Sequence, residues 1–219
     1  MEILNNFAVF EGGDGSGTST QLALLERNLS ACPPRDCPHG LTFFSTFEPT
    51  GGAVGLLIRS ALKRDTIMQA QTLARLFAAD RGEHLYAPGG IVEHCRLNEL
   101  VVCDRYVLSS LVYQGIECGD ELPRRLNSPF PAPELLLFFD LDPHIAQERL
   151  ASRPSLEIFE NLEFQKKVRE RYRSLLDEYR DAGVRVELID ASQSPEKAAE
   201  DVWRAIVKMP IFKQGTSKN

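Results

Sequence analysis

FEGGDGSGTSTQ, the stretch from Phe10 to Gln21, decides the fold. It follows a short apolar run and precedes a segment with helical spacing, so it predicts a turn between a strand and a helix. Gly12 and Gly17 have the separation found in phosphate-binding loops, where successive backbone N–H groups face phosphate oxygens. Ser19 stands where such loops place a hydroxyl that binds Mg2+. A glycine-rich turn without a ligand is the alternative interpretation.

One position of this loop departs from the pattern. A lysine is expected at position 18, where its ammonium group neutralises charge on the transferred phosphate, but the residue is Thr18. Thr donates one hydrogen bond and carries no charge, and losing one preorganised electrostatic donor costs roughly a hundred- to a thousand-fold in rate. Thr18 is either natural or introduced, and the sequence is compatible with both. It bears on turnover more than on folding.

Apolar runs alternate with helical segments along the chain. Continuous apolar runs suit strands buried on both faces, as in a parallel sheet. Five strands alternating with helices predict a doubly wound, three-layer α/β/α fold with right-handed crossovers. The expected strands are Phe7–Glu11, Leu41–Thr46, Leu100–Cys103, Leu135–Leu141 and Val184–Ile189. The expected helices are Thr18–Leu29, Gly52–Leu62, Ile67–Tyr86 and Phe159–Tyr179, with two more that start at Asp142–Pro143 and Ser194–Pro195.

Composition and charge fit one globular domain over residues 1–219. The net charge of −6 and the pI of about 5.3 argue against a protein that coats nucleic acid. No apolar run reaches the roughly 18 residues that a membrane span needs. The N-terminus lacks the basic patch of a secretory signal. We therefore expect a cytoplasmic protein with no nucleic-acid or membrane partner.

The five cysteines have an odd count and irregular spacing, so they do not predict a disulfide framework. Reduced thiols are the default expectation for a cytoplasmic chain. Cys32, Cys37 and His39 lie close together, but without a paired CxxC a zinc site is the weaker alternative. We expect Ala31–Gly40 to form a surface loop and Lys213–Asn219 to fray.

Three further motifs accompany the loop: FEPTGG at Phe47–Gly52, LFAADR at Leu76–Arg81 and DRYVLSSLVYQG at Asp104–Gly115. Together with FEGGDGSG they resemble bacterial thymidylate kinases of the P-loop kinase class along most of the chain. The resemblance implies a P-loop α/β fold with a short lid, and transfer of a phosphate from ATP to dTMP with Mg2+. It also implies a homodimer that packs through helices such as Ile67–Tyr86.

The same resemblance assigns roles to individual residues. The ATP-binding residues it implies are Gly12, Gly13, Asp14, Gly15, Ser16, Gly17, Thr18, Ser19 and Thr20. The dTMP-binding residues are Asp14, Glu48, Pro49, Arg59, Phe77, Arg81, Arg105, Ser109, Ser110, Tyr113 and Gln114. The catalytic residues are Asp14, Arg105, Arg149 and Arg153, and the residues that bind or order Mg2+ are Ser19 and Asp104.

The residue types suit these roles. Phe77 offers a flat apolar face to a base. Arg81 offers a hydrogen-bond donor to a thymine carbonyl. The guanidinium groups of Arg59 and Arg105 can bind the acceptor phosphate through two N–H groups each. Tyr113 crowds the 2′ position of the sugar. Each residue alone has a simpler interpretation: Phe77 and Tyr113 as packing residues, Asp80–Arg81 as a solvated helix pair, and Asp104–Arg105 as a structural ion pair after a strand.

The expected lid, at about residues 149–160, has fewer arginines than the resemblance leads us to expect. Arg149 and Arg153 match, but Ile158 stands where a further Arg is expected, and Phe47 replaces an Arg in FEPTGG. With Thr18, three expected cations are therefore uncharged residues.

Two explanations remain open for the lost charge. Arg149, Arg153 or Lys166 replaces it, or the protein binds nucleotide and turns over poorly. The basic block at residues 166–173 is by default a solvated helix face. Another nucleoside monophosphate kinase, or a deoxynucleoside kinase, is a third interpretation, against which LFAADR and SSLVYQG argue.

Overall fold

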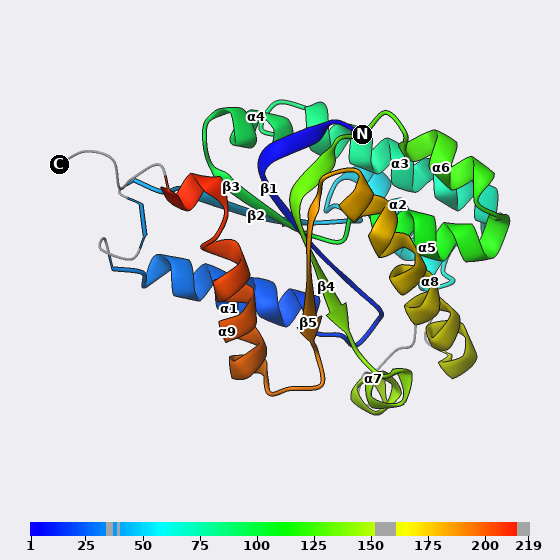
Figure 1. The fold of residues 1–219 in the computed structure, drawn as a ribbon. Coiled ribbons are helices and arrows are strands. Elements are labelled where there is room, and N and C mark those ends of the chain that lie inside the picture. Colours follow the sequence, from blue (N-terminus) through cyan, green and yellow to red (C-terminus); the bar gives the residue numbers. More distant parts are fainter. Residues whose placement is uncertain (34–36, 39, 152–160, 214–219) are drawn as a thin grey trace.

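The computed structural model describes residues 1–33, 37–38, 40–151 and 161–213. Within them, five strands form one parallel sheet in the order β2-β3-β1-β4-β5 (Figure 1). The strands are β1 (Ile3–Gly12), β2 (Phe43–Phe47), β3 (Leu100–Asp104), β4 (Ala132–Asp140) and β5 (Arg185–Asp190). The predicted five-stranded parallel sheet is confirmed, although β1 begins four residues before the predicted Phe7.

Helices cover both faces of this sheet (Figure 1). The described helices are α1 (Thr18–Ser30), α2 (Ala53–Leu62), α3 (Ala70–Tyr86), α4 (Ile91–Arg96), α5 (Val107–Cys118), α6 (Glu121–Asn127), α7 (Pro143–Leu150), α8 (Leu162–Asp181) and α9 (Pro195–Ile206), with a short 3-10 turn at Pro210–Lys213. Helices α1 and α9 pack on one face, and α3, α4, α5 and α8 pack on the other. The sequence did not predict α4, α5 and α6, although the motif that opens α5 was found.

Successive residues of the central strands point into different cores. Phe7 and Val9 of β1 belong to the core under α3, α5 and α8, while Ala8 and Phe10 belong to the core under α1 and α9. The expectation that strands are buried on both faces is therefore right for β1, β3 and β4. It is wrong for β2 and β5, which lie at the sheet edges and are partly exposed; Leu188 of β5 is 53% exposed.

Two helix starts match the sequence signals. Asp142 caps α7 by accepting a hydrogen bond from the His144 N–H at 2.9 Å, and Ser194 caps α9 by accepting one from the Lys197 N–H. Helix α8 starts at Leu162 behind the cap Asn161, whereas the prediction placed its start at position 159, which lies outside the described residues.

The cysteines correct one expectation. Cys32 and Cys37 form a disulfide between the end of α1 and the following loop, with their Cα atoms 6.0 Å apart. Cys95, Cys103 and Cys118 are free thiols. Counting cysteines detects a framework but not a single local bridge between residues five positions apart. Because both thiols are used, the zinc alternative for Cys32 and Cys37 is also wrong; His39 lies outside the described residues.

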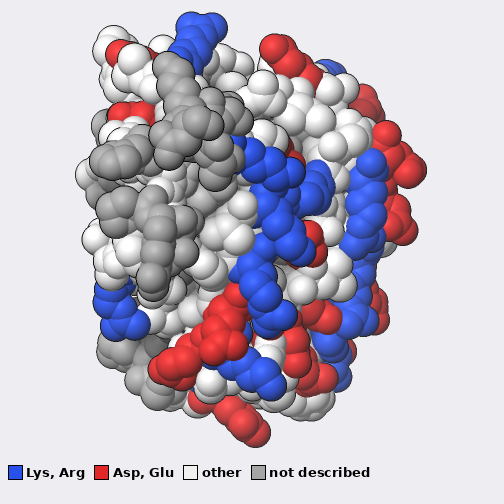
Figure 2. Space-filling view, turned by 60° about the vertical axis from the view of Figure 1, so that its left-hand side comes forward, with Lys and Arg blue, Asp and Glu red and all other residues white. Residues whose placement is uncertain are grey.

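The surface carries both signs of charge. On the face shown in Figure 2, Lys and Arg side chains gather in two bands, and Asp and Glu side chains border both bands. In the described part of the chain, no helix has the length and apolar character needed to cross a membrane.

Candidate active site

A cavity of about 540 Å³ lies where β1, β2 and β3 end, within the size range of small-molecule sites. The loop after β1, the end of β2, α3 and the first half of α5 supply its walls. The predicted residues that line it are Gly13, Asp14, Gly15, Ser16, Gly17, Thr18, Ser19, Thr20, Glu48, Pro49, Arg59, Phe77, Arg81, Asp104, Arg105, Ser109, Ser110, Tyr113 and Gln114. One cavity therefore brings together the two halves of the predicted site.

Two predicted residues, Gly12 and Arg149, do not line the cavity, and a third is not among the described residues. Gly12 lies beneath the loop, where an added Cβ would come 2.5 Å from Ser16 Oγ and 3.0 Å from the Phe139 carbonyl oxygen. Arg149 lies beside the loop rather than in the lining of the cavity. Arg153 lies outside the described residues.

The loop after β1 turns through two glycines in the left-handed conformation. Gly15 has a φ of 81° and Gly17 a φ of 87°, values that residues with a Cβ rarely adopt. The Ser16 N–H donates to the Gly13 carbonyl at 3.2 Å, and α1 begins at Thr18, directly after Gly17. The loop and the start of α1 therefore present backbone N–H groups and the positive end of a helix dipole, which suits an anion.

A hydroxyl and a carboxylate meet beside this loop. Ser19 Oγ donates to Asp104 Oδ2 at 2.5 Å. The other oxygen, Asp104 Oδ1, is buried and has no hydrogen-bond partner within the described residues. An unpartnered carboxylate oxygen beside a hydroxyl is the kind of oxygen donor set that a hard divalent cation prefers, so the residues present fit Mg2+.

Arg105 lies between the phosphate loop and α5. Its Nη2 donates to Asp14 Oδ1 at 2.6 Å, and its guanidinium lies over the Tyr113 ring, 5.4 Å from the centroid. Gln165 of α8 donates to the other Asp14 oxygen at 2.9 Å. The Arg105 backbone has a φ of 69°, a left-handed conformation that is unusual outside glycine.

Arg81 lies at the other end of the cavity and is 1% exposed. Its Nε and Nη2 donate to Glu48 Oε2 at 2.9 and 2.6 Å, its Nη2 also donates to Ser110 Oγ at 3.1 Å, and its Nη1 donates to Asn127 Oδ1. Four of its five N–H groups thus have an acceptor in the described part of the chain. Burial is the largest influence on the pKa of Arg81 and lowers it, but Glu48, Tyr106 and Glu11 together outweigh burial, so the net shift is upward and the side chain stays cationic.

Comparison with known proteins shows the family to which this chain belongs. The sequence profile of the family described as "Thymidylate kinase" matches residues 10–202, which include the phosphate loop and every lining residue of the cavity. The chain belongs to the thymidylate kinase family. The match also spans α8, which carries Gln165 against the phosphate loop.

Individual thymidylate kinase relatives match over nearly the whole chain. A protein of Treponema pallidum (strain Nichols) named "Putative thymidylate kinase" is 42% identical over 205 residues, which is 92% of this chain and 95% of that protein. A "Probable thymidylate kinase" of Pyrobaculum aerophilum is 37% identical over 208 residues, covering 94% of this chain and 99% of that protein. A third, from Methanococcus maripaludis (strain DSM 14266), is 41% identical over 175 residues, covering 80% of this chain and 79% of that protein.

Phe47, which replaces an arginine expected from the family resemblance, contacts a cation. The Arg59 guanidinium lies 5.2 Å from the centroid of the Phe47 ring, and Arg59 also donates to the Pro49 carbonyl. Both Phe47 and Arg59 line the cavity. An aromatic ring in this position holds a neighbouring arginine by cation–π attraction instead of adding a charge of its own.

The simpler interpretation of Asp80–Arg81 as a solvated helix pair is wrong. Arg81 pairs with Glu48, whereas Asp80 accepts hydrogen bonds from the Thr50 N–H at 2.7 Å and from Thr50 Oγ1 at 2.6 Å. The Glu48–Arg81 pair and the hydrogen bonds of Asp80 to Thr50 therefore fix the segment after β2 on α3. This segment carries Pro49 into the cavity wall.

Arg149 of α7, the first residue of the expected lid, reaches the loop after β1. Its Nη1 donates to the Gly15 carbonyl at 3.3 Å and its Nη2 to the Ala191 carbonyl at 3.0 Å. Lys166, a candidate replacement for the missing charge, forms an exposed pair with Glu163 at 2.8 Å. Position 158, like Arg153, lies outside the described residues.

Glu48, His84 and Cys103 lie close enough to suggest a metal cluster. Hydrogen bonds already use the candidate ligand atoms: His84 Nδ1 meets Glu48 Oε1 at 3.1 Å, His84 Nε2 meets Thr46 Oγ1 at 2.6 Å, and Cys103 Sγ donates to the Arg105 carbonyl at 3.0 Å. Glu48 Oε2 is bound to Arg81. We therefore interpret this group as support for the end of the cavity that contains Arg81.

Sequence reasoning missed three members of the site. His84 follows Arg81 by three positions on one helix face, so helical spacing could have found it. Asn127 on α6 and Gln165 on α8 carry no such signal, because they approach Arg81 and Asp14 only through the packing of distant helices.

Proposed function

We propose that this protein transfers a phosphate from ATP to dTMP with Mg2+, yielding ADP and dTDP in the synthesis of dTTP. The observation that carries the proposal is that one cavity joins a phosphate-binding loop to a pocket lined by Phe77, Arg81 and Gln114. The family match supports the transfer reaction over a protein that only binds nucleotide.

On the donor side, the backbone N–H groups of residues 13–19 and the N-terminus of α1 hold the ATP phosphates. Arg149, which contacts the Gly15 carbonyl, lies close enough to this loop to turn toward the donor phosphates. Arg153 would act from the expected lid, whose closure excludes water from the reaction.

On the acceptor side, Arg105 and Arg59 hold the dTMP phosphate in line with the terminal phosphate of ATP. Asp14 keeps the Arg105 guanidinium at the boundary between the two phosphates. The dTMP phosphate oxygen attacks directly, so no protein nucleophile is required.

At the base end, Phe77 stacks on the thymine ring and the remaining N–H of Arg81 donates to a thymine carbonyl. Gln114 Oε1 is buried without a hydrogen-bond partner among the described residues, and the N3–H of thymine would supply one. Ser110 orients Arg81, and Tyr113 occupies the space where a ribose 2′-hydroxyl would lie.

Ser19 and Asp104 would hold Mg2+ beside the donor phosphates, directly or through water. When bound, the ion supplies positive charge to the phosphate oxygens during transfer. This protein's own contribution there is to keep the hydroxyl and the carboxylate together at the end of β3.

The proposal includes a homodimer in the cytoplasm. Leu56 and Leu57 on α2 and Ile67 before α3 are exposed apolar side chains, at 59%, 40% and 95%. They give the α2–α3 face the apolar surface that a partner subunit would cover. Sedimentation analysis measures the oligomeric state.

A coupled assay of ADP release tests the function. We expect turnover with dTMP to exceed turnover with AMP, CMP or UMP by at least tenfold, and a reaction without acceptor gives the background. Equal rates with dTMP and the other three nucleotides would remove the assignment to thymidylate. Binding of ATP and dTMP without ADP release would instead favour the protein that only binds nucleotide.

A further inference from the structure

Glu11 is a buried carboxylate to which the proposed mechanism gives no task. It precedes Gly12 near the end of β1, is 0% exposed, and does not line the cavity. Four hydrogen bonds converge on it. They come from the Tyr106 N–H at 2.9 Å, the Ser109 N–H at 3.2 Å, Ser109 Oγ at 2.6 Å and Tyr172 Oη at 3.0 Å.

These donors surround the residue that holds the acceptor phosphate. The Arg105 N–H donates to the Phe10 carbonyl at 2.8 Å, and the next N–H, that of Tyr106, donates to Glu11 Oε1. Two consecutive residues of β1 thus fix the two peptide groups that flank Arg105. The left-handed conformation of Arg105 is unfavourable for a residue with a Cβ, so it persists only where its surroundings hold it.

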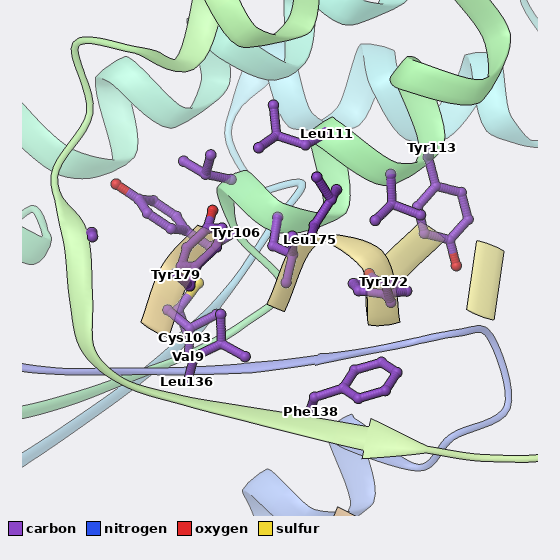
Figure 3. Close-up of a cluster of buried hydrophobic side chains, with 14 of the residues drawn as sticks. Val9, Cys103, Tyr106, Leu111, Tyr113, Leu136, Phe138, Tyr172, Leu175 and Tyr179 are labelled. Atoms are coloured by element: carbon purple, nitrogen blue, oxygen red, sulfur yellow. The ribbon is translucent and has the colours of Figure 1, made fainter. Parts of the chain in front are cut away.

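The side chain of Arg105 is linked to the same carboxylate. Arg105 Nη1 donates to Ser109 Oγ at 3.4 Å, and that hydroxyl donates to Glu11 Oε2. Tyr172 of α8 contacts both Ser109 Oγ, at 2.8 Å, and Glu11. Figure 3 shows Tyr172 between the sheet and Tyr113, whose ring lies under the Arg105 guanidinium.

Glu11 and Arg105 also interact electrostatically. Burial raises the pKa of Glu11, while the hydrogen bond from Ser109 and the charge of Arg105 lower it, and burial outweighs them. The four donors are nevertheless fixed around the two carboxylate oxygens by residues at the start of α5 and by Tyr172. A side chain of the same shape without charge would satisfy them less well.

We propose that Glu11 is a positioning residue, which sets the guanidinium of Arg105 for the phosphate of the acceptor nucleotide. This inference rests on the proposed function, because it concerns the same acceptor phosphate. Glu11 does not touch the nucleotide. It acts through the peptide groups around Arg105 and through Ser109, so its effect is confined to interactions that Arg105 makes.

Comparing dTMP with thymidine separates this role from general support of the fold. Thymidine keeps the base and the sugar but lacks the phosphate. In Glu11→Gln, we expect the dissociation constant for dTMP to rise about tenfold, and that for thymidine to stay within twofold, by isothermal titration calorimetry. Glu134→Gln is the matched control, because Glu134 also accepts a backbone N–H, that of Asn6 at 2.8 Å, but does not line the cavity.

A double substitution tests whether Glu11 acts on dTMP binding through Arg105. In an Arg105→Met background, Glu11→Gln should change the dTMP dissociation constant by less than twofold, because the group that it positions is gone. Tyr172→Phe removes one of the four donors without removing the carboxylate. It should weaken dTMP binding about twofold to threefold and leave thymidine binding unchanged, and it provides the test if Glu11→Gln does not fold.

Equal losses for dTMP and thymidine in Glu11→Gln, or an undiminished effect in the Arg105→Met background, would show that Glu11 supports the fold rather than Arg105. Unchanged dTMP binding in folded Glu11→Gln overturns the proposal outright. Failure of the proposed function looks different, since the unsubstituted protein would then bind dTMP no better than AMP.

Discussion

The half of the cavity proposed to bind the acceptor (the acceptor half) and the half proposed to bind the donor (the donor half) are built in different ways. In the acceptor half, side-chain charges are fixed before any ligand arrives: Arg81 is paired with Glu48, and Arg105 with Asp14. In the donor half, the loop of residues 13–19 offers mainly backbone N–H groups, and Thr18 stands where a lysine would supply a charge. In the proposed function, selection of the acceptor therefore depends on preorganised ion pairs, whereas holding the donor depends on main-chain geometry.

Because of this difference, we expect substitutions in the two halves of the cavity to have different effects. Damage to the acceptor half should affect nucleotide choice and the stability of the fold together, because its Arg81–Glu48 pair is buried and its Arg105–Asp14 pair is partly buried. Changes in the donor half should affect the rate with little effect on the fold, because backbone groups tolerate a change of side chain.

The largest expected effect concerns Arg105. Arg105→Met should lower kcat/KM for dTMP about a thousandfold, because it removes a bidentate phosphate donor and leaves Asp14 without its cation. Steady-state kinetics with dTMP as the varied substrate measure this. Arg124→Met is the matched control: Arg124 pairs with Glu178 on the surface, so this variant should stay within twofold. A loss below tenfold in Arg105→Met would contradict a fixed acceptor half.

Next in size is the buried pair at the base end. Glu48→Gln should lower the free energy of unfolding by about 3 kcal/mol, because it leaves the Arg81 cation buried without its carboxylate. Chemical denaturation followed by circular dichroism measures the change. Glu178→Gln breaks an exposed pair and should cost less than about 1 kcal/mol. Equal costs in the two variants would show that the base end is not held by its ion pair.

The donor half is tested by restoring its charge. Thr18→Lys should raise kcat about a hundredfold, because the new ammonium group supplies a preorganised charge beside the donor phosphates. Thr18→Met, which adds length without charge, should not raise the rate. A Thr18→Lys variant as slow as the unsubstituted protein would show that the donor half does not lack charge, and that another cation already takes this role.

The smallest expected effect lies outside the cavity, at the end of β4. Burial is the largest influence on the pKa of Asp140 and raises it, but the hydrogen bonds from Arg169 and Arg173 and the charges of these two arginines together outweigh burial and lower the pKa. A lowered folded-state pKa means that ionised Asp140 stabilises the fold above pH of about 4, and that this contribution is lost as the pH falls through the folded-state value.

Asp140→Asn should therefore show a smaller drop in Tm between pH 7 and pH 3 than the unsubstituted protein, by an amount corresponding to about 1 kcal/mol or less. Thermal unfolding at both pH values measures it, and Asp190→Asn, which removes an exposed carboxylate bound to Ser192, is the comparison. An identical pH dependence in Asp140→Asn would show that its arginine pairs do not survive in solution.

The sequence predicted the strands and the residue types of the site better than it predicted the contacts between side chains. The glycine spacing and the apolar runs identify the loop and the five strands, because these signals lie within short windows. Most of the other lining residues follow from the resemblance of the motifs to thymidylate kinases, and spacing alone does not show them. The pairing of Arg81 with Glu48 joins residues 33 positions apart, and that of Gln165 with Asp14 joins residues 151 positions apart. Periodicity carries no information about such partners, so the network that holds Arg81 and Arg105 could be found only from the packed structure.

The start of α5 shows the same limit in the backbone. DRYVLSSLVYQG identifies Arg105 as a functional residue, but nothing in its letters predicts a left-handed arginine followed by a helix. That conformation depends on Phe10 and Glu11, which come from a strand far earlier in the chain.

The central place of β1 in the sheet also governs when the site can first exist during synthesis. The Ser19–Asp104 and Asp14–Arg105 hydrogen bonds span 85 and 91 positions, and β1 pairs with β3 and β4 rather than with β2. A nascent chain that has emerged only as far as α4 holds the nucleotide loop without the strand that completes its pocket. A nucleotide can therefore bind to and stabilise only chains that have been translated past α5. The contacts between residues that lie 85 and 91 positions apart must form before any such stabilisation, and forming contacts over this separation is slow.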